Sequence, residues 1–330
     1  MKITDFAILF VIIFFPLFWL SGLHTDEQAQ ASSLQISYTT ALRTAAQDAG
    51  QVMSTNEQQQ YEAGYSSEKF FRADKELALH TFLNTLYLNF GIRGDESAQQ
   101  NLLHYIPAIV VIDYDGYYIY ATEDYTGSDG LPNARHIWHP KKPYAYSDAQ
   151  GNSIQFTLDH YVHVVEASTG KVLDGEAEQL ADQTNIALLD QINTFEQVRR
   201  TAIVSSIQKD LAYYINKHNE YASRYGISYT FTLPTISQEE WNNSINDISI
   251  ISFLQGIPTG SGYYNNYALG GGRLVKKTSW LGTTDPDSGI KYAYPNGCKL
   301  PAPAQDLFTD AKEAAKSGYF LRDCRNPLIH

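Results

Sequence analysis

Residues 6–23 of the sequence read FAILFVIIFFPLFWLSGL and contain no charged side chain. As an α-helix this run would be about 27 Å long, close to the thickness of the hydrocarbon core of a bilayer. Lys2 precedes the run, whereas Asp26 and Glu27 follow it. This charge distribution predicts a cytoplasmic N-terminus at residues 1–5, a transmembrane helix at 6–23 and an extracytoplasmic remainder.

A cleaved signal peptide is the alternative interpretation of the same run, because Ala29, Gln30 and Ala31 fit the small-x-small pattern of a processing site. The apolar run is long for a signal peptide, and the candidate site lies well beyond its end. Both interpretations place the rest of the chain on the extracytoplasmic side of the membrane. The uncleaved helix is the preferred interpretation, so we expect a single-pass protein of the cell membrane, with the lipid bilayer as a partner.

An alanine-rich stretch follows directly, and we predict a helical stalk over residues 24–57. Its apolar positions recur every three or four residues, which aligns them on one face of a helix. Small side chains allow a second helix to approach closely. The face suits self-association or contact with other membrane-anchored subunits, and packing on the chain's own globular part is the alternative. The positions are Leu34, Tyr38, Ala41, Ala45, Ala49 and Val52.

The composition fits an exported globular part with an α+β fold. Hydrophobic residues make up 43% of the chain, enough to build a core, and the net charge of −12 argues against nucleic acid as a partner. We expect a mixed head over 68–225, with an antiparallel sheet and helices. Within it we predict a hairpin at 108–122, turning at Asp115-Gly116, and a long helical segment at 176–224.

The remaining part, residues 226–330, is rich in tyrosine and glycine and contains both cysteines of the chain, Cys298 and Cys324. Outside the cytoplasm such a pair is most simply a disulfide, which would contribute about 3 to 4 kcal/mol by the chain-entropy model. Two unpaired thiols are the alternative. The spacing excludes a CxxC redox or zinc motif.

The sharpest hint of catalysis is Asp113-Tyr114-Asp115-Gly116, which follows an apolar stretch. It resembles the first half of the haloacid-dehalogenase phosphatase signature, in which the first aspartate is the nucleophile and the second the acid/base. Position 117 is tyrosine, where that family has threonine or valine. No later pair of aspartates suggests a magnesium site, so a plain hairpin turn is the preferred interpretation.

Two HxxH pairs, His136/His139 and His160/His163, raise the question of a zinc site. The second pair lies in a predicted strand, where residues three apart point to opposite faces. The acidic loop at 285–289 lacks the residues that an EF-hand needs at its sixth and twelfth positions. We therefore predict no catalytic residue, no cofactor and no resident metal.

Residues 1–53 and the cysteine-bearing tail resemble pilin-like and TadE-like subunits of Gram-positive pilus or secretion machineries. The resemblance implies a non-enzymatic structural or assembly subunit of a bacterial envelope complex, in which the helix packs among partner helices and the head makes surface contacts. Asp5 invites comparison with the acidic residue near the start of type IV pilins. However, no prepilin-peptidase site precedes the apolar run.

Two further classes of function stay open. The predicted order of helix, hairpin, aromatic loop, strand and long helix is similar to extracytoplasmic Cache or PAS-like domains, which implies a ligand-binding sensor head. Such a head would need a partner to transmit a signal, because only about five residues precede the predicted span. An exported phosphatase-like hydrolase using Asp113 and Asp115 is the third class.

Overall fold

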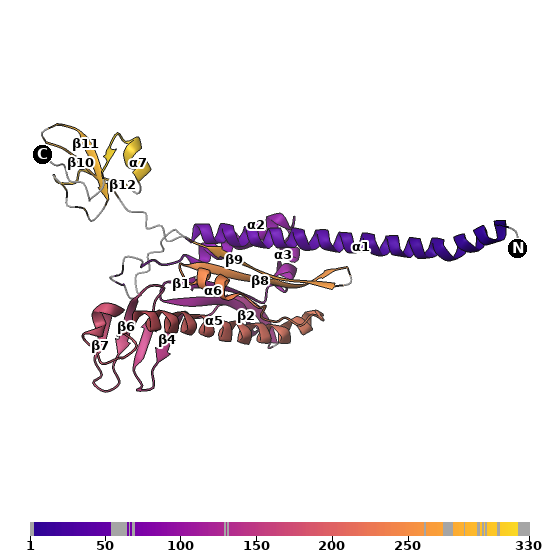
Figure 1. The fold of residues 1–330 in the computed structure, drawn as a ribbon, viewed down its shortest axis with the longest axis horizontal. Helices are drawn as coiled ribbons and strands as arrows, with labels where there is room; N and C mark the ends of the chain where they lie inside the picture. The colour runs from indigo at the N-terminus through magenta and orange to yellow at the C-terminus, as the bar shows by residue number, and fades with distance from the viewer. Residues whose placement is uncertain are drawn as a thin grey trace. The chain divides into compact units, whose positions relative to one another are not determined.

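The chain divides into two compact units in the computed structural model, Met1–Leu274 and Val275–His330, and each is described by itself (Figure 1). The structure describes residues 3–53, 65, 67, 70–128, 130, 132–260, 262–272, 280–286, 288–295, 298, 300, 302–308 and 311–322. The predicted linker around residues 54–67 lies mostly outside these ranges.

The first unit is an α+β structure built on a large antiparallel sheet. Its described residues form nine strands in the order β7-β6-β5-β4-β2-β1-β8-β9, with β3 also paired to β2. The elements are α1 (Ile3–Val52), α2 (Lys75–Asn89), α3 (Glu96–Leu103), β1 (Ala108–Asp113), β2 (Gly116–Thr126), β3 (Pro132–Trp138), β4 (Lys142–Ser147), β5 (Ser153–Phe156), β6 (Tyr161–Val165), β7 (Val172–Glu176), α4 (Ala177–Ala181), α5 (Ile192–Ala222), the 3₁₀ turn η1 (Ser223–Tyr225), α6 (Gln238–Ser244), β8 (Ser249–Thr259) and β9 (Gly262–Gly271).

The predicted transmembrane stalk requires a correction. Among the described residues, no helix combines the length and the apolar character needed to cross a bilayer. The apolar run at 6–23 is not an element of its own: it begins the 50-residue helix α1, which continues without a break through Asp26 and Glu27. The predicted single-pass topology and bilayer contact depended on that span.

The hairpin of β1 and β2 lies at the centre of the sheet. Asp113 pairs with Gly116, so Tyr114 and Asp115 form the turn between the strands. Every residue of β1 is buried, because β1 lies between β2 and β8 and helices pack on the sheet. A Cβ atom on Gly116 would lie 2.5 Å from the carbonyl oxygen of Lys142, so this close approach to the next strand requires glycine.

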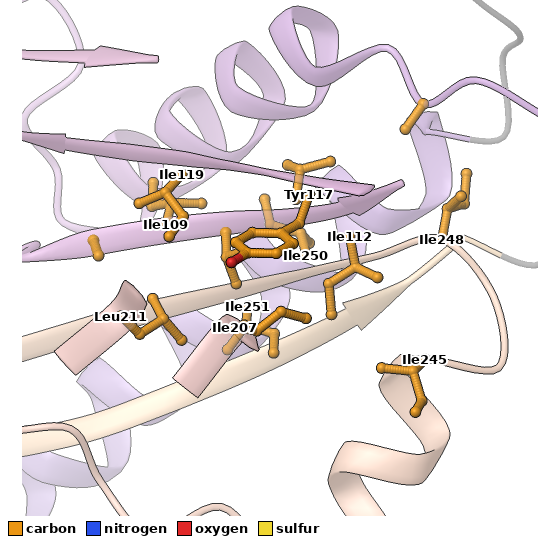
Figure 2. Packing of buried hydrophobic residues seen from close by; sticks show 14 of the residues in the cluster. Ile109, Ile112, Tyr117, Ile119, Ile207, Leu211, Ile245, Ile248, Ile250 and Ile251 are labelled. Atoms are coloured by element: carbon orange, nitrogen blue, oxygen red, sulfur yellow. The ribbon is translucent and has the colours of Figure 1, made fainter. Parts of the chain in front are cut away.

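Two long helices lie along the sheet, as Figure 1 shows. The C-terminal part of α1 contacts α2, β8 and β9, whereas α5 contacts β1, β2 and β4. Ile207 and Leu211 of α5 are fully buried and lie near Tyr117 of β2 and Ile251 of β8 (Figure 2). This packing buries the aliphatic stripe of α5 and fixes the helix on the sheet.

The boundaries of the elements refine the predicted domains. The helical segment expected at 176–224 consists of a short helix, α4, and the 31-residue helix α5, with an irregular stretch between them. The predicted C-terminal part began at residue 226, whereas the compact units divide after Leu274. Strands β8 and β9 therefore belong to the first unit, because β8 pairs with the central strand β1.

The second unit has a small sheet of its own. Its described residues form β10 (Trp280–Thr284), β11 (Lys291–Pro295), β12 (Asp306–Phe308), α7 (Ala311–Lys316) and β13 (Phe320–Leu321), with the strand order β12-β10-β11-β13. A separate core contains Ala293, Phe308, Ala314 and Tyr319. Cys298 takes part in a disulfide bond. Cys324, the other half of the predicted pair, lies outside the described residues, so the pairing itself stays a prediction.

Candidate functional site

A cavity of about 670 Å³ opens in the first unit, beside the N-terminal part of α5. Five parts of the described chain form its wall: Ser67, the turn between β5 and β6, the end of β7, residues 196–200 of α5 and the loop between α6 and β8. The lining residues are predominantly charged or polar: Ser67, Leu158, Asp159, His160, Glu176, Glu196, Arg199, Arg200, Asn246 and Asp247.

Glu196 holds both arginines of α5 in place. Its carboxylate accepts hydrogen bonds from Nε and Nη2 of Arg199, both at 2.8 Å, and from Nε of Arg200 at 2.6 Å. Burial acts to raise the pKa of Glu196, but the hydrogen bonds and positive charges of Arg199 and Arg200 outweigh it and lower that pKa to about 2. Glu196 is therefore anionic at any physiological pH.

The remaining guanidinium nitrogens also have acceptors. Nη1 of Arg199 donates to the carbonyl oxygen of Thr157 at 2.9 Å, and the side chain of Arg199 is almost fully buried. Nη1 and Nη2 of Arg200 donate to the carbonyl oxygen of Asn242 and to the side-chain oxygen of Asn246. Both arginines are thus held in fixed orientations by the protein itself.

Asp159 is a second fixed anion in this wall. It accepts hydrogen bonds from the hydroxyls of Ser67, Tyr114 and Thr157 and from the backbone nitrogen of Tyr161. Burial acts to raise its pKa, but these hydrogen bonds favour the charged form and lower the pKa below its ordinary value. Asp159 therefore carries its charge without a cation as its direct partner among these contacts.

The two aspartates of the phosphatase-like sequence lie elsewhere, in a cluster at the turn between β1 and β2. Nζ of Lys141 lies 2.8 Å from Oδ2 of Asp113 and also contacts Asp115. Oδ1 of Asp113 accepts from the backbone nitrogens of Ala73 and Tyr114. Burial acts to lower the pKa of Lys141, but the two carboxylates outweigh it and raise that pKa.

This cluster has the features of a structural ion pair. Asp113 is 2% exposed, and neither aspartate lines the large cavity. A phosphatase nucleophile has to reach its substrate, whereas Asp113 is covered and bound by a lysine and two backbone amides. The geometry therefore favours the hairpin-turn interpretation of Asp113 and Asp115.

The two HxxH pairs are separated in the fold. His136, on β3, is half-buried and lies next to His218 of α5, and the hydroxyl of Thr122 lies within hydrogen-bond distance of both rings. Burial lowers the pKa of His136 and of His218 to about 4. His160 lines the large cavity, whereas His163 pairs with Asp174 on the neighbouring strand. The pairs thus do not converge on one point.

Across the described part of the chain, no group of three or more His, Cys, Asp or Glu side chains is arranged to hold a metal ion. In the acidic loop at 285–289, the carboxylate of Asp285 accepts a hydrogen bond from the hydroxyl of Ser288. Asp287 lies outside the described residues. The contacts among the described residues of this loop are typical of a polar turn between β10 and β11.

The predicted stalk face divides into two parts. Ala41, Ala45 and Ala49 are buried within the first unit, which corresponds to the intramolecular alternative. Tyr38 and Val52 are half-buried, and the ring of Tyr38 stacks on Phe90 with centroids 5.1 Å apart. Leu34 is exposed.

The charged cavity was not predicted from the sequence. Its local signal is the spacing of Glu196, Arg199 and Arg200, since residues three and four apart lie side by side on a helix. The turn residues Asp159 and His160 and the loop residue Asp247 join this group only through the fold. No known protein family, no curated protein and no solved structure matches the chain.

Proposed function

We propose that the protein is a non-enzymatic structural or assembly subunit that joins copies of itself through the exposed part of α1. The observation that carries this proposal is the contrast between the two parts of this helix. Ala41, Ala45 and Ala49 lie in the core of the first unit. Residues 31–39 lie beside the β8–β9 hairpin, and the part of α1 before them extends beyond the sheet (Figure 1). The exposed large apolar residues of α1 are Phe10, Val11, Ile12, Phe14, Phe15, Leu34 and Ile36.

Such an extension is costly in water unless another surface covers it. Burying apolar surface contributes about 25 cal/mol per Å², and exposed contiguous apolar surface usually marks an interaction site. A second copy offers a helix of the same length and character, so the two can pack side by side over many turns. The C-terminal part of α1, which is buried in the core, would then attach each globular unit to the assembly.

The disulfide at Cys298 supports a location outside the cytoplasm, since disulfides persist in oxidising compartments. Together with the extended helix this favours an envelope complex, of pilus or secretion type, over a cytoplasmic assembly. The buried position of Asp113 and the lysine bound to it disfavour a hydrolase.

Photo-crosslinking tests the proposal. A benzoylphenylalanine side chain is placed at Phe14 or at Ile36, and the native disulfide is left intact. We expect crosslinked dimers and higher multimers of the full chain from both positions on irradiation. The matched control is Tyr213 on α5, an aromatic residue that is 59% exposed, against 65% for Ile36. Equal yields at Tyr213, or no crosslinks at either α1 position, would contradict the proposal.

The substitution Ile36→Ser separates assembly from folding. Because the side chain of Ile36 is exposed, the free energy of unfolding should change by less than about 0.5 kcal/mol. The yield of multimers crosslinked through position 14 should nevertheless fall. If the yield of crosslinked multimers and the free energy of unfolding were both unchanged, Ile36 would not be part of the interface.

A further inference from the structure

We propose that Lys141 forms an amide bond with Asp113 inside the folded chain, and that Asp115 carries the protons of this reaction. The bond is made once in each chain, so the inference is independent of the assembly role. It starts from reactive groups in contact: Nζ of Lys141 lies 2.8 Å from Oδ2 of Asp113 and also contacts the carboxylate of Asp115. An amine, a carboxyl carbon and a proton acceptor are the groups that acyl transfer requires.

The surroundings of Asp113 suit the carboxyl group that is attacked. Its Oδ1 accepts hydrogen bonds from the backbone nitrogen of Ala73 at 3.0 Å and from that of Tyr114 at 2.9 Å. Two backbone N–H groups at this distance stabilise the negative charge that the oxygen gains when a nucleophile attacks the carboxyl carbon, as in an oxyanion hole. Oδ2, which faces Lys141, is then the oxygen that leaves.

Burial favours the amide over the ion pair. Both aspartates are buried, and Nζ of Lys141 lies 5.4 Å from the centroid of the Tyr118 ring. Charges removed from water are costly even when they are paired, whereas an amide is neutral. The burial that keeps an external substrate away from Asp113 does not exclude Lys141, because the lysine is already in contact with it.

The fold holds the three groups in place. Asp113 ends β1, Asp115 lies in the turn that follows, and Lys141 directly precedes β4. The hydroxyl of Tyr144, which is fully buried, donates to the carbonyl oxygen of Asp113 at 2.8 Å. The hydroxyl of Tyr65 donates to Oδ2 of Asp115 at 2.8 Å. Reacting groups fixed in this way need no encounter step, which removes much of the entropic part of the barrier.

The atoms balance without a co-reactant. Burial acts to lower the pKa of Lys141, but the carboxylates raise it, so the side chain starts as an ammonium group. It gives one proton to Oδ2 of Asp113, and Nζ then bonds to Cγ. Asp115 takes a second proton from Nζ and passes it to Oδ2, which leaves as water. The third proton stays on the amide nitrogen, and Asp115 is a carboxylate again.

Mass spectrometry of the purified full-length chain, reduced and denatured, tests this assignment. We expect a mass lower than that of the sequence by one water molecule. Trypsin does not cleave after an acylated lysine, so residues 94–135 and 136–171 should appear as one branched peptide. Fragmentation of that peptide should locate the branch at Asp113 and Lys141.

Matched variants test the role of each group. Lys141→Arg keeps the positive charge but cannot form the amide, so it should lose no water and give no branched peptide. Asp115→Asn removes the proton carrier and should slow the reaction about a hundredfold or more, which leaves most chains without the bond after a short expression. Lys142→Arg is the control, since Lys142 pairs with Asp210 at 2.7 Å and is half exposed. It should keep the bond.

A wild-type chain that trypsin cleaves after Lys141 would overturn the assignment, and so would a branch located at Asp115. A cyclic imide at Asp115-Gly116 lowers the mass by the same amount but leaves Lys141 open to trypsin, so that outcome also counts against the proposal. If Lys141→Arg or Asp115→Asn does not fold, the digests of the wild type and of Lys142→Arg still decide the question.

Discussion

Helices α1 and α5 both pack on the main sheet, but with opposite kinds of side chain. In α1 the closest approach to the sheet is made by Ala46 and Gly50, against Gly270 and Gly271 of β9, and buried alanines flank it. Leu42 and Met53 are the larger buried side chains of this helix. In α5 the contact is made by large residues such as Phe195, Ile207 and Leu211, all fully buried.

The two helices are therefore held on the sheet in different ways. A Cβ atom on Gly270 would lie 1.7 Å from the carbonyl oxygen of Ala46, so the backbones of α1 and β9 are in direct contact. Such a contact has no room for added atoms. The α5 contact depends instead on the volume of its side chains, so it is sensitive to their removal.

Adding one methyl group to the α1 contact should give the largest effect. Gly270→Ala forces the new Cβ against the backbone of α1, which cannot rotate away as a side chain would. We expect a loss of about 4 kcal/mol in the free energy of unfolding, at the severe end of overpacking. Urea denaturation followed by circular dichroism measures it.

Gly271→Ala is the matched control, one residue further along β9. No heavy atom lies within 4 Å of the position a Cβ would take there, and this glycine is exposed. The substitution should change the free energy of unfolding by less than about 0.5 kcal/mol. Similar losses in the two variants would mean that the close α1 contact does not limit residue size at Gly270.

Removing volume from the α5 contact should have the next largest effect. Leu211→Ala leaves a cavity in the core, and we expect a loss of about 3 kcal/mol in the free energy of unfolding. Leu211→Met keeps the volume and should cost less than about 1.5 kcal/mol. If the alanine and methionine variants were equally stable, side-chain volume would not be what holds α5.

Much of this architecture follows from local sequence. β-Branched and aromatic residues on both sides of Asp115-Gly116 predict the central hairpin, and the structure has β1 and β2 there with Asp113 opposite Gly116. The periodic apolar residues of 176–224 predict helix, and α5 forms most of that segment. These features depend on neighbours within a few residues, which is where periodicity is informative.

The rest depends on contacts that local patterns do not contain. The alanine stripe of α1 is compatible with either a partner helix or the chain's own sheet, and only the position of Gly270, more than 200 residues away, decides between them. The prediction of a membrane span was wrong: it rested on the apolar run at 6–23 alone, whereas no helix among the described residues is long and apolar enough to cross a bilayer. The charged cavity likewise combines Asp159, Glu176 and Asp247 from separate segments.

Acid should weaken the attachment of α5 through His218 and its neighbour His136 of β3, whereas Ala46, Gly50 and Gly270 of the α1 contact do not titrate. His218, near the end of α5, donates to or accepts from Thr122 and contacts the carbonyl oxygen of His104. Burial lowers its pKa, and that of His136, to about 4 from an ordinary value of 6.5. Between these two values the unfolded chain binds more protons than the folded chain, so stability falls as pH falls.

Comparing pH 7 with pH 5 isolates this effect. From these pKa values, each of the two histidines should cost about 2 kcal/mol over that interval. Burial also lowers the pKa of His104 and His139, and both act in the same direction. Carboxylates with lowered pKa values, such as Glu196, lose their contribution only at more acidic pH.

The variant His218→Gln tests whether His218 contributes to this loss of stability in acid. The test compares the change in stability between two pH values, so the absolute stability of the variant does not matter. Urea denaturation of both proteins at pH 7 and pH 5 gives the loss of free energy that each suffers on acidification. Because glutamine does not titrate, the variant should lose about 2 kcal/mol less than the wild type. Equal losses would mean that His218 is not among the groups that make the α5 contact sensitive to acid. A smaller loss in the variant, together with an unchanged cost for Gly270→Ala at both pH values, would show that the two helices are held by physically separate means.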